Sequence, residues 1–266
     1  FLNVAEGCYR FSHSSYADFL AAQGMMEYLD EKEWGRIVFA PEGAPYPQWE
    51  GVLPWLAARS NDILRKVKKS RPDLLLGTDA LVDKLGADEI CKAILEHAEE
   101  ISSSVRNSPA VQARYYALNT DKCARTIRNV LKSTKSNVIL DVAVDIIRRA
   151  RLMSVSDLLV EMFCDETLDL SLRKSAGYAL VELANKKQRS RCKKVLQGPM
   201  VNQLKGIVLR MAWPDLMSVE ELTPLLGTKS GKVTDSFSMW LEHDGFVASL
   251  SRLSSKDKLK ILSWAV

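Results

Sequence analysis

Apolar residues recur at intervals of three and four along almost the whole chain, and strict two-residue alternation is nearly absent. The first spacing lines one face of an α-helix, whereas alternation lines one face of a strand. Only 13 glycines and 9 prolines interrupt the 266 residues, mostly between the periodic stretches. The sequence therefore predicts an all-α fold. The exception is the alternating stretch from Tyr9 to His13, which could form one strand, and nothing after it resembles a partner strand.

Capping residues and helix breakers place the first helices. The pair Ser14-Ser15 is an N-cap signal that predicts a helix start. The segment from Ala40 to Pro47 contains three prolines and a glycine, which predicts a long loop or a domain boundary. Beyond this segment the apolar spacing predicts helices over residues 49–58, 61–69, 79–85 and 88–101.

From Pro109 onward, helices of about 10–15 residues alternate with short turns, as in stacked antiparallel hairpins. Three similar segments begin at residues 139, 172 and 204, which are 33 and 32 residues apart. A two-helix unit of this length has an apolar face that only its neighbours can cover. We therefore expect an α-solenoid of degenerate HEAT-like helical hairpins. In the middle segment the spacing places Arg173, Lys174 and Glu182 on the exposed face, and it predicts a buried face formed by Leu172, Ala176, Ala179, Leu180 and Leu183.

Charge and cysteine content narrow the class of protein. The 37 basic and 33 acidic residues leave a formal charge of +4, which is too small to mark a nucleic-acid binder. The cysteines are odd in number, far apart and without a C-x-x-C pair, which indicates free thiols in a reducing cytosol. They are Cys8, Cys91, Cys123, Cys164 and Cys192. No apolar run approaches the roughly 18 residues of a membrane span, and the opening residues lack an export signal. We therefore expect a cytoplasmic protein without membrane contact, and the start at Phe1 suggests a part of a longer protein.

Two motifs resemble those of one protein family. Residues 9–22, YRFSHSSYADFLAA, resemble the signature F-x-H-x-x-[FY]-x-E-[FY]-[LF]-A-A at the end of the winged-helix region of NACHT-type signal-transduction (STAND) ATPases. Asp18 stands where that family usually has Glu, and Ala17 where Gln is common. Residues 204–215, LKGIVLRMAWPD, are similar to the L-[KR]-G-x-x-L-[KR]-x-x-W-P box in the C-terminal repeats of bacterial NACHT proteins. In this box Gly206, Trp213 and Pro214 have structural roles as a close-contact residue, an apolar anchor and a helix stop.

The resemblance implies a division of the chain and a function. Residues 1–40 would end a winged-helix or helical switch module, 41–108 would form a helical linker domain, and 109–266 would form HEAT-like repeats. Such repeats sense a ligand, here a protein trigger, and relay it to an upstream NTPase module in the same parent chain, in bacterial defence or signalling. His13 matches the family histidine that contacts the phosphates of bound ADP. In this chain alone, a simple capping or packing role of His13 is the stronger reading.

No catalytic, cofactor or metal site is expected within the chain itself. The resemblance implies that ATP or ADP binds the parent protein. Within this chain the string from Gly227 to Val233 departs from a phosphate-binding loop in spacing and in its last residue, so we expect an ordinary loop there. His97 and Glu100 lie three apart on one predicted helix, a spacing that could face a metal. Since no second histidine is near, a solvated helix face is the better interpretation. We therefore expect a binding protein rather than an enzyme.

Basic clusters offer an alternative function. Residues 65–71 hold one cluster of five cations, and two further clusters could share one edge of the stacked repeats. The predicted binding edge consists of Arg148, Arg149, Arg151, Lys186, Lys187, Arg189, Arg191, Lys193 and Lys194. Such an edge would follow the phosphates of a nucleic acid. Cations at helix C-termini also complement the helix dipole, and aromatic residues are not interleaved as in single-strand binders. Protein sensing, nucleic-acid binding and a passive scaffold therefore remain open.

Overall fold

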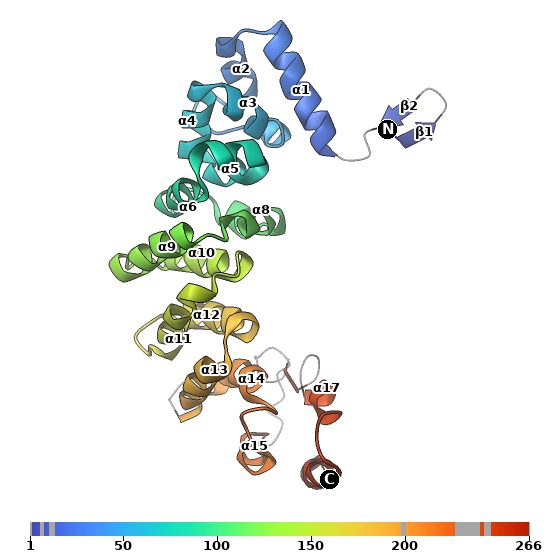
Figure 1. Cartoon of the computed structure of the whole chain (residues 1–266), viewed down its shortest axis with the longest axis vertical. Helices are drawn as coiled ribbons and strands as arrows, with labels where there is room; N and C mark the ends of the chain where they lie inside the picture. The colour runs from blue at the N-terminus through green and yellow to red at the C-terminus, as the bar shows by residue number, and fades with distance from the viewer. Residues whose placement is uncertain are drawn as a thin grey trace. The chain divides into compact units, whose positions relative to one another are not determined.

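The protein, described here from a computed structural model, is all-α with its helices packed in a helical-repeat arrangement (Figure 1). The structure describes residues 2–5, 8–10, 14–197, 201–226, 240–241 and 246–265. The chain forms two compact units, Phe1–Leu152 and Met153–Val266, and each is described separately. The predicted domain boundaries at residues 41 and 109 both fall within the first unit and stay predictions.

A short antiparallel hairpin precedes the helices. Strand β1 (Leu2–Ala5) pairs with β2 (Cys8–Arg10), with Leu2 opposite Arg10. A strand was expected over residues 9–13 without a partner after it. The described strand begins one residue earlier, and its partner lies before it in the sequence.

The first helices of unit 1 lie close to the predicted ones, but the helix expected over residues 49–58 begins only at Leu53, because residues 47–49 form a 3-10 turn. The helices are α1 (Ser14–Tyr28), α2 (Glu31–Val38), η1 (Pro47–Trp49), α3 (Leu53–Arg59), α4 (Asn61–Ser70), η2 (Pro72–Gly77), α5 (Asp79–Leu85) and α6 (Ala87–Glu96). The Ser60 side chain accepts from the Ile63 amide and caps α4, while Asp30 and Glu33 form a capping box on α2. The proline-rich segment is a closed turn rather than an open loop, because Tyr46 N donates to Val38 O at 3.0 Å.

The rest of unit 1 consists of α7 (Ser103–Arg106), α8 (Pro109–Arg114), η3 (Tyr115–Leu118), α9 (Asp121–Ser133) and α10 (Asn137–Arg149). Helix α9 packs on α6, and α10 packs on α6, α8 and α9. The predicted helix over residues 88–101 is shorter than expected, since α6 ends at Glu96 and His97 is its C-cap.

Unit 2 has α12 at its centre. Its elements are η4 (Met153–Val155), α11 (Ser156–Cys164), α12 (Leu170–Leu183), α13 (Lys186–Cys192), η5 (Lys193–Gln197), α14 (Val201–Ala212), α15 (Val219–Leu226), α17 (Phe246–Leu250) and α18 (Ser255–Ala265). Helix α12 packs on both α11 and α14. All five residues of its predicted buried face are buried. A Cβ atom at Gly177 would lie 2.6 Å from Phe163 Cε2 and 2.8 Å from Ile207 Cγ2, so this glycine sets the helix separation.

The prediction that Arg173 lies on the exposed face of α12 is wrong. Its side chain is only 3% exposed, and its Nε donates to the Phe163 carbonyl at 3.1 Å. A buried guanidinium is tolerated where its N–H groups have hydrogen-bond partners, and here α11 provides one. Glu182 is exposed as predicted, and Lys174 is half-buried.

The three similar segments occupy corresponding helices. They fall on α10, α12 and α14, and the α-helix that precedes each of these in the sequence is α9, α11 and α13 respectively. After α14, Trp213 enters a core with Leu222, Trp240 and Phe246, and its Nε1 donates to Ser249 Oγ at 2.5 Å. The predicted role of Trp213 as an apolar anchor is therefore confirmed. None of the described helices has the length and apolar character needed to cross a bilayer.

Candidate interaction surfaces

Helix α1, which contains most of the NACHT-like signature, exposes large apolar side chains. Tyr16 is 60% exposed and Leu20 49% exposed, whereas only Ala22 and Met25 are buried on this 15-residue helix. The side facing α3 is held by Phe19, whose ring meets Trp55 edge-on at a centroid distance of 5.0 Å. An exposed aromatic and aliphatic cluster of this kind typically marks a contact surface.

The Asp18 carboxylate, at the family's usual Glu position, lies directly against Gly51, where a Cβ atom would clash with it. This close approach fixes the N-terminal half of α1 on the turn before α3. His13, the expected nucleotide contact of the parent protein, lies outside the described residues.

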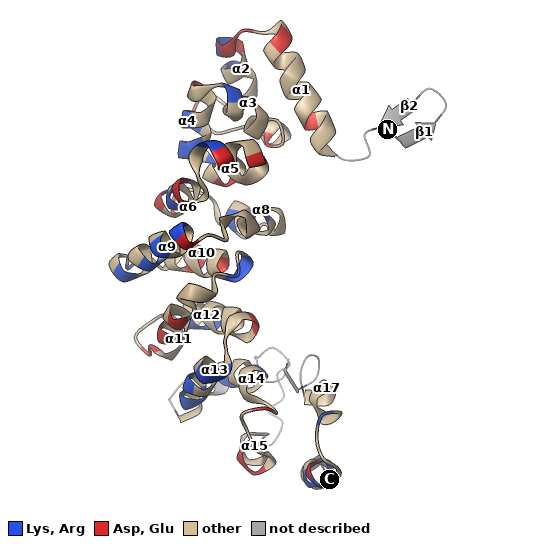
Figure 2. Ribbon diagram, viewed as in Figure 1, with Lys and Arg blue, Asp and Glu red and all other residues tan. Residues whose placement is uncertain are grey.

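The six cations of residues 186–194 belong to unit 2, on α13 and η5 (Figure 2). Three of them bind groups within the unit. Arg189 Nε donates to Ala184 O at 2.9 Å, and Arg191 lies 3.4 Å from Asp157. Lys193 Nζ donates to Leu216 O at 3.0 Å and pairs with Glu221 at 2.7 Å. The remaining three, Lys186, Lys187 and Lys194, are exposed.

Arg148, Arg149 and Arg151 belong to unit 1, at the end of α10. Arg149 Nη2 donates to Gln112 Oε1 at 3.0 Å, and Arg151 has a φ of 53° just beyond the helix. These positions match the general preference for cations at a helix C-terminus. The nine residues of the predicted edge thus form two local groups, one in each unit.

The cluster over residues 65–71 is partly internal. Arg71 is buried and donates to Asp73 through Nε and Nη2, each at 2.9 Å, and it also pairs with Glu50. Burial opposes the charged form of Arg71, but the hydrogen bonds that it donates to Asp73 and Glu50 outweigh this effect and raise the pKa of Arg71. This guanidinium therefore ties η1, α4 and η2 together instead of facing a ligand.

Helix α9 has a cationic face that we did not single out from the sequence. Four exposed cations lie three or four residues apart along it: Lys122, Arg125, Arg128 and Lys132. Figure 2 shows this concentration of blue on α9 within unit 1. The three-to-four spacing was present in the sequence and could have revealed the face.

A surface depression of about 390 Å³ lies beside the cationic face of α9, between α6 and α9. Apolar atoms of Leu95, Val130 and Ile139 form much of its floor, with the side chains of Lys92, Glu96 and Asn129 around them. It is the right size for a small ligand or for one or two side chains of a partner.

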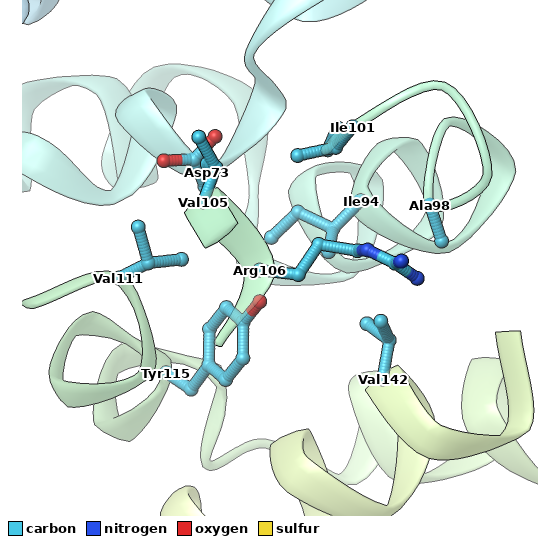
Figure 3. A pocket seen from close by; sticks show the side chains of 9 residues that line it. All are labelled: Asp73, Ile94, Ala98, Ile101, Val105, Arg106, Val111, Tyr115 and Val142. Atoms are coloured by element: carbon cyan, nitrogen blue, oxygen red, sulfur yellow. The ribbon is translucent and has the colours of Figure 1, made fainter. Parts of the chain in front are cut away.

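An interior polar group near η2 has a structural role. Figure 3 shows the Tyr115 hydroxyl directed toward Arg106, whose guanidinium lies between Ala98 and Val142. Burial, together with the negative charges of Asp73 and Asp145, raises the pKa of Tyr115. The gap that these residues line is too narrow to hold a water molecule. Arg106 Nε is buried here without a hydrogen-bond partner, and the group belongs to the packed interior of unit 1 rather than to an open ligand site.

Within the described parts of the chain, no three His, Cys, Asp or Glu side chains are grouped as metal ligands would be. His97 Nδ1 lies 2.9 Å from Glu100 Oε2, so these two side chains interact with each other at the end of α6. No family model, curated protein or solved structure matches the chain.

Proposed function

We propose that the chain is the ligand-sensing, protein-interaction repeat region of a NACHT-type STAND NTPase of the cytoplasm, possessing no catalytic site of its own. The observation that supports this most directly is the exposed apolar side of α1, the helix that contains the family-like signature. An upstream nucleotide-binding module in the same parent chain would cover Tyr16 and Leu20. ATP or ADP would bind in that module, with His13 as a phosphate contact.

The repeats would supply the sensing surface for a protein trigger, with a role in bacterial defence or signalling. Stacked hairpins suit this task, because each adds exposed side chains to a continuous buried core. The depression between α6 and α9 offers one place where a partner side chain could insert.

The full-length product of the gene allows a direct test. We expect the double variant Tyr16→Ser/Leu20→Ser to lose co-purifying ADP and to hydrolyse ATP without a trigger, since the apolar contact that holds the closed state is removed. The matched control is Tyr116→Ser, an aromatic that is 69% exposed on η3 of the same unit. Retention of ADP by the α1 variant at the level of the control would contradict the proposal.

Nucleic-acid binding is a second candidate, favoured by the cationic face of α9. Binding dominated by phosphate contacts weakens steeply with salt, with a log–log slope near −0.9 per contact on duplex DNA. Titration of labelled duplex and single-stranded DNA or RNA at about 50 and 200 mM salt measures that slope. The sensor proposal expects weak binding, whereas the alternative expects a steep slope that the reversal Arg125→Glu/Lys132→Glu reduces more than Lys186→Glu/Lys187→Glu.

A further inference from the structure

Four of the five cysteines form two thiol pairs, although they are far apart in the sequence. Cys91 on α6 lies next to Cys123 on α9 in unit 1, and Cys164 on α11 lies next to Cys192 on α13 in unit 2. In each pair one thiol donates a hydrogen bond to the other sulfur. All four are free thiols. The two pairs differ in their surroundings, and this difference predicts different chemistry.

The pair in unit 2 combines an accessible sulfur with a buried one. Cys164 is partly exposed at the last residue of α11, whereas Cys192, the last residue of α13, is fully buried. Helices α11 and α13 pack together, and the two thiols at their last residues interact with each other. A disulfide needs a sulfur–sulfur distance of about 2.0 Å, so the two sulfur atoms must move closer for the bond to form.

Three cations, on α12, α13 and η5, lie near Cys164. Arg173 of α12 donates to the carbonyl of Phe163, the residue just before Cys164, at 3.1 Å. Arg191 of α13 and Lys194 of η5 are the other nearby cations, and Arg191 also pairs with Asp157 of α11 at 3.4 Å. Asp165 is the acid next to Cys164 in the sequence. The hydrogen bond from Cys192 is the main effect that lowers the pKa of Cys164 to about 7, these cations act in the same direction, and burial opposes them. The negative end of the α11 dipole also acts to raise the pKa of Cys164. The cations therefore offset both burial and the helix dipole.

We propose that Cys164 and Cys192 are a peroxide-sensitive dithiol, with Cys164 as the attacking thiolate and Cys192 as the resolving thiol. The Cys164 thiolate attacks one oxygen of a hydroperoxide, the O–O bond breaks, and the departing oxygen takes a proton and leaves as an alcohol or water. Cys164 becomes a sulfenic acid. The Cys192 sulfur then attacks the Cys164 sulfur, the S–O bond breaks, and the thiol proton leaves with the hydroxyl as water. Two thiols lose two electrons, and the peroxide gains them.

The product disulfide joins the C-terminal ends of α11 and α13 and encloses α12 in a covalent loop. Oxidation would therefore lock the central hairpin of unit 2. The Cys91–Cys123 pair provides an internal comparison, because both cysteines are fully buried and the adjacent charge is the acidic Asp88, which opposes the lowering of the Cys123 pKa by its hydrogen bond with Cys91. A peroxide must reach the thiolate to react with it, so this buried pair is expected to react more slowly.

The test is peptide mapping of the whole chain by mass spectrometry without reduction, after timed exposure to hydrogen peroxide at pH 7. We expect a peptide that joins Cys164 to Cys192 and lacks two hydrogens, formed severalfold faster than any Cys91–Cys123 link. The difference in rate follows from the partial exposure of Cys164 and the full burial of Cys91 and Cys123. In Cys192→Ser, dimedone should trap a sulfenic acid at Cys164, and in Cys164→Ser no link and no adduct at Cys192 should form.

Two outcomes would overturn the proposal. One is formation of the Cys91–Cys123 link at an equal or faster rate, and the other is absence of the dimedone adduct at Cys164 in folded Cys192→Ser. If Cys192→Ser does not fold, the variant Arg191→Gln/Lys194→Gln keeps both thiols and changes exposed residues only. It should lower the rate of Cys164 alkylation by iodoacetamide at pH 7 severalfold, and an unchanged rate would also contradict the proposal.

Discussion

Single side chains decide how closely the helices of this protein approach one another. At Gly177 the missing side chain lets α12 contact Phe163 of α11 and Ile207 of α14 together. At Arg173 a charged side chain is buried because a backbone carbonyl of α11 accepts its N–H. At Asp145 a carboxylate is largely buried and accepts from Gln112 Nε2 at 2.9 Å.

The substitution Gly177→Ala is expected to lower the free energy of unfolding by about 1–3 kcal/mol, because the new methyl group overpacks the contact of three helices. Chemical denaturation with urea, followed by circular dichroism, measures the change. Gly24→Ala on α1 is the matched control, since a Cβ there meets nothing within 4 Å. That control should stabilise the protein by up to about 1 kcal/mol, and equal losses in both variants would refute the packing argument.

The pH dependence of stability should reveal Asp145. Burial is the main effect that raises its pKa to about 6, the charge of Asp141 adds to it, and Arg149 and Arg148 oppose it. A raised folded-state pKa means that the folded state binds a proton more tightly than the unfolded chain. The resulting stabilisation is complete below about pH 4 and is lost as the pH rises through 6.

Asp145→Asn removes the buried charge but keeps an oxygen that can accept from Gln112. At pH 7.5 this variant should be more stable than the natural chain by about 1–2 kcal/mol, since one pKa unit corresponds to about 1.4 kcal/mol and partial exposure reduces the effect. Near pH 4 the difference should vanish. Asp83→Asn, an exposed substitution, controls for the loss of one negative charge. If Asp145→Asn raised the free energy of unfolding equally at pH 7.5 and near pH 4, the raised pKa of Asp145 would be contradicted.

At the scale of elements, capping interactions determine where the helices start. Asn185 and Gln188 form a capping box on α13, and Gln188 Nε2 also donates to Ser156 Oγ at 2.8 Å at the start of α11. The same residues thus cap one helix and attach it to another. This dual role explains how a helix as short and as basic as α13 is held in a fixed position against α11.

Asn185→Ala should lower the free energy of unfolding by about 1 kcal/mol, because the amide hydrogen of Gln188 loses its acceptor. Urea denaturation provides the measurement. Lys187→Ala, an exposed substitution on the same helix, should change the value by less than about 0.5 kcal/mol. Equal effects would mean that the cap contributes nothing beyond helix propensity.

At the scale of the whole molecule, two compact units each contain their own buried core. Separate expression of residues 1–152 and 153–266 should give two helical fragments that each unfold cooperatively in circular dichroism. A cut at residues 108 and 109 should fail, because it separates α6 from α9, which pack together. If fragment 1–108 folded as well as fragment 1–152, the predicted boundary at 109 would be preferred.

Local signals predicted many elements closely. The helix expected over 79–85 has those bounds, and the helix expected over 61–69 is α4, because Ser60, Arg71 and Pro72 act within one turn of its ends. The candidate sites were less predictable. Arg71 and Lys193 looked like members of cationic clusters, yet each binds an acid about 20 to 30 residues away. Apolar spacing and residue type contain no information about such partners.

The amino-acid order alone determined that this chain is built from paired helices and which face of α12 is buried, since propensity, caps and apolar spacing act over a few neighbouring residues. Only the tertiary structure decided that Arg173 is buried, that the cationic clusters are partly neutralised, and that Cys164 meets Cys192. These features arise from groups on different helices, whose distances depend on how the helices pack. The lowered pKa of Cys164 is therefore a property of the folded unit, because its hydrogen-bond donor and its cations come from α12, α13 and η5.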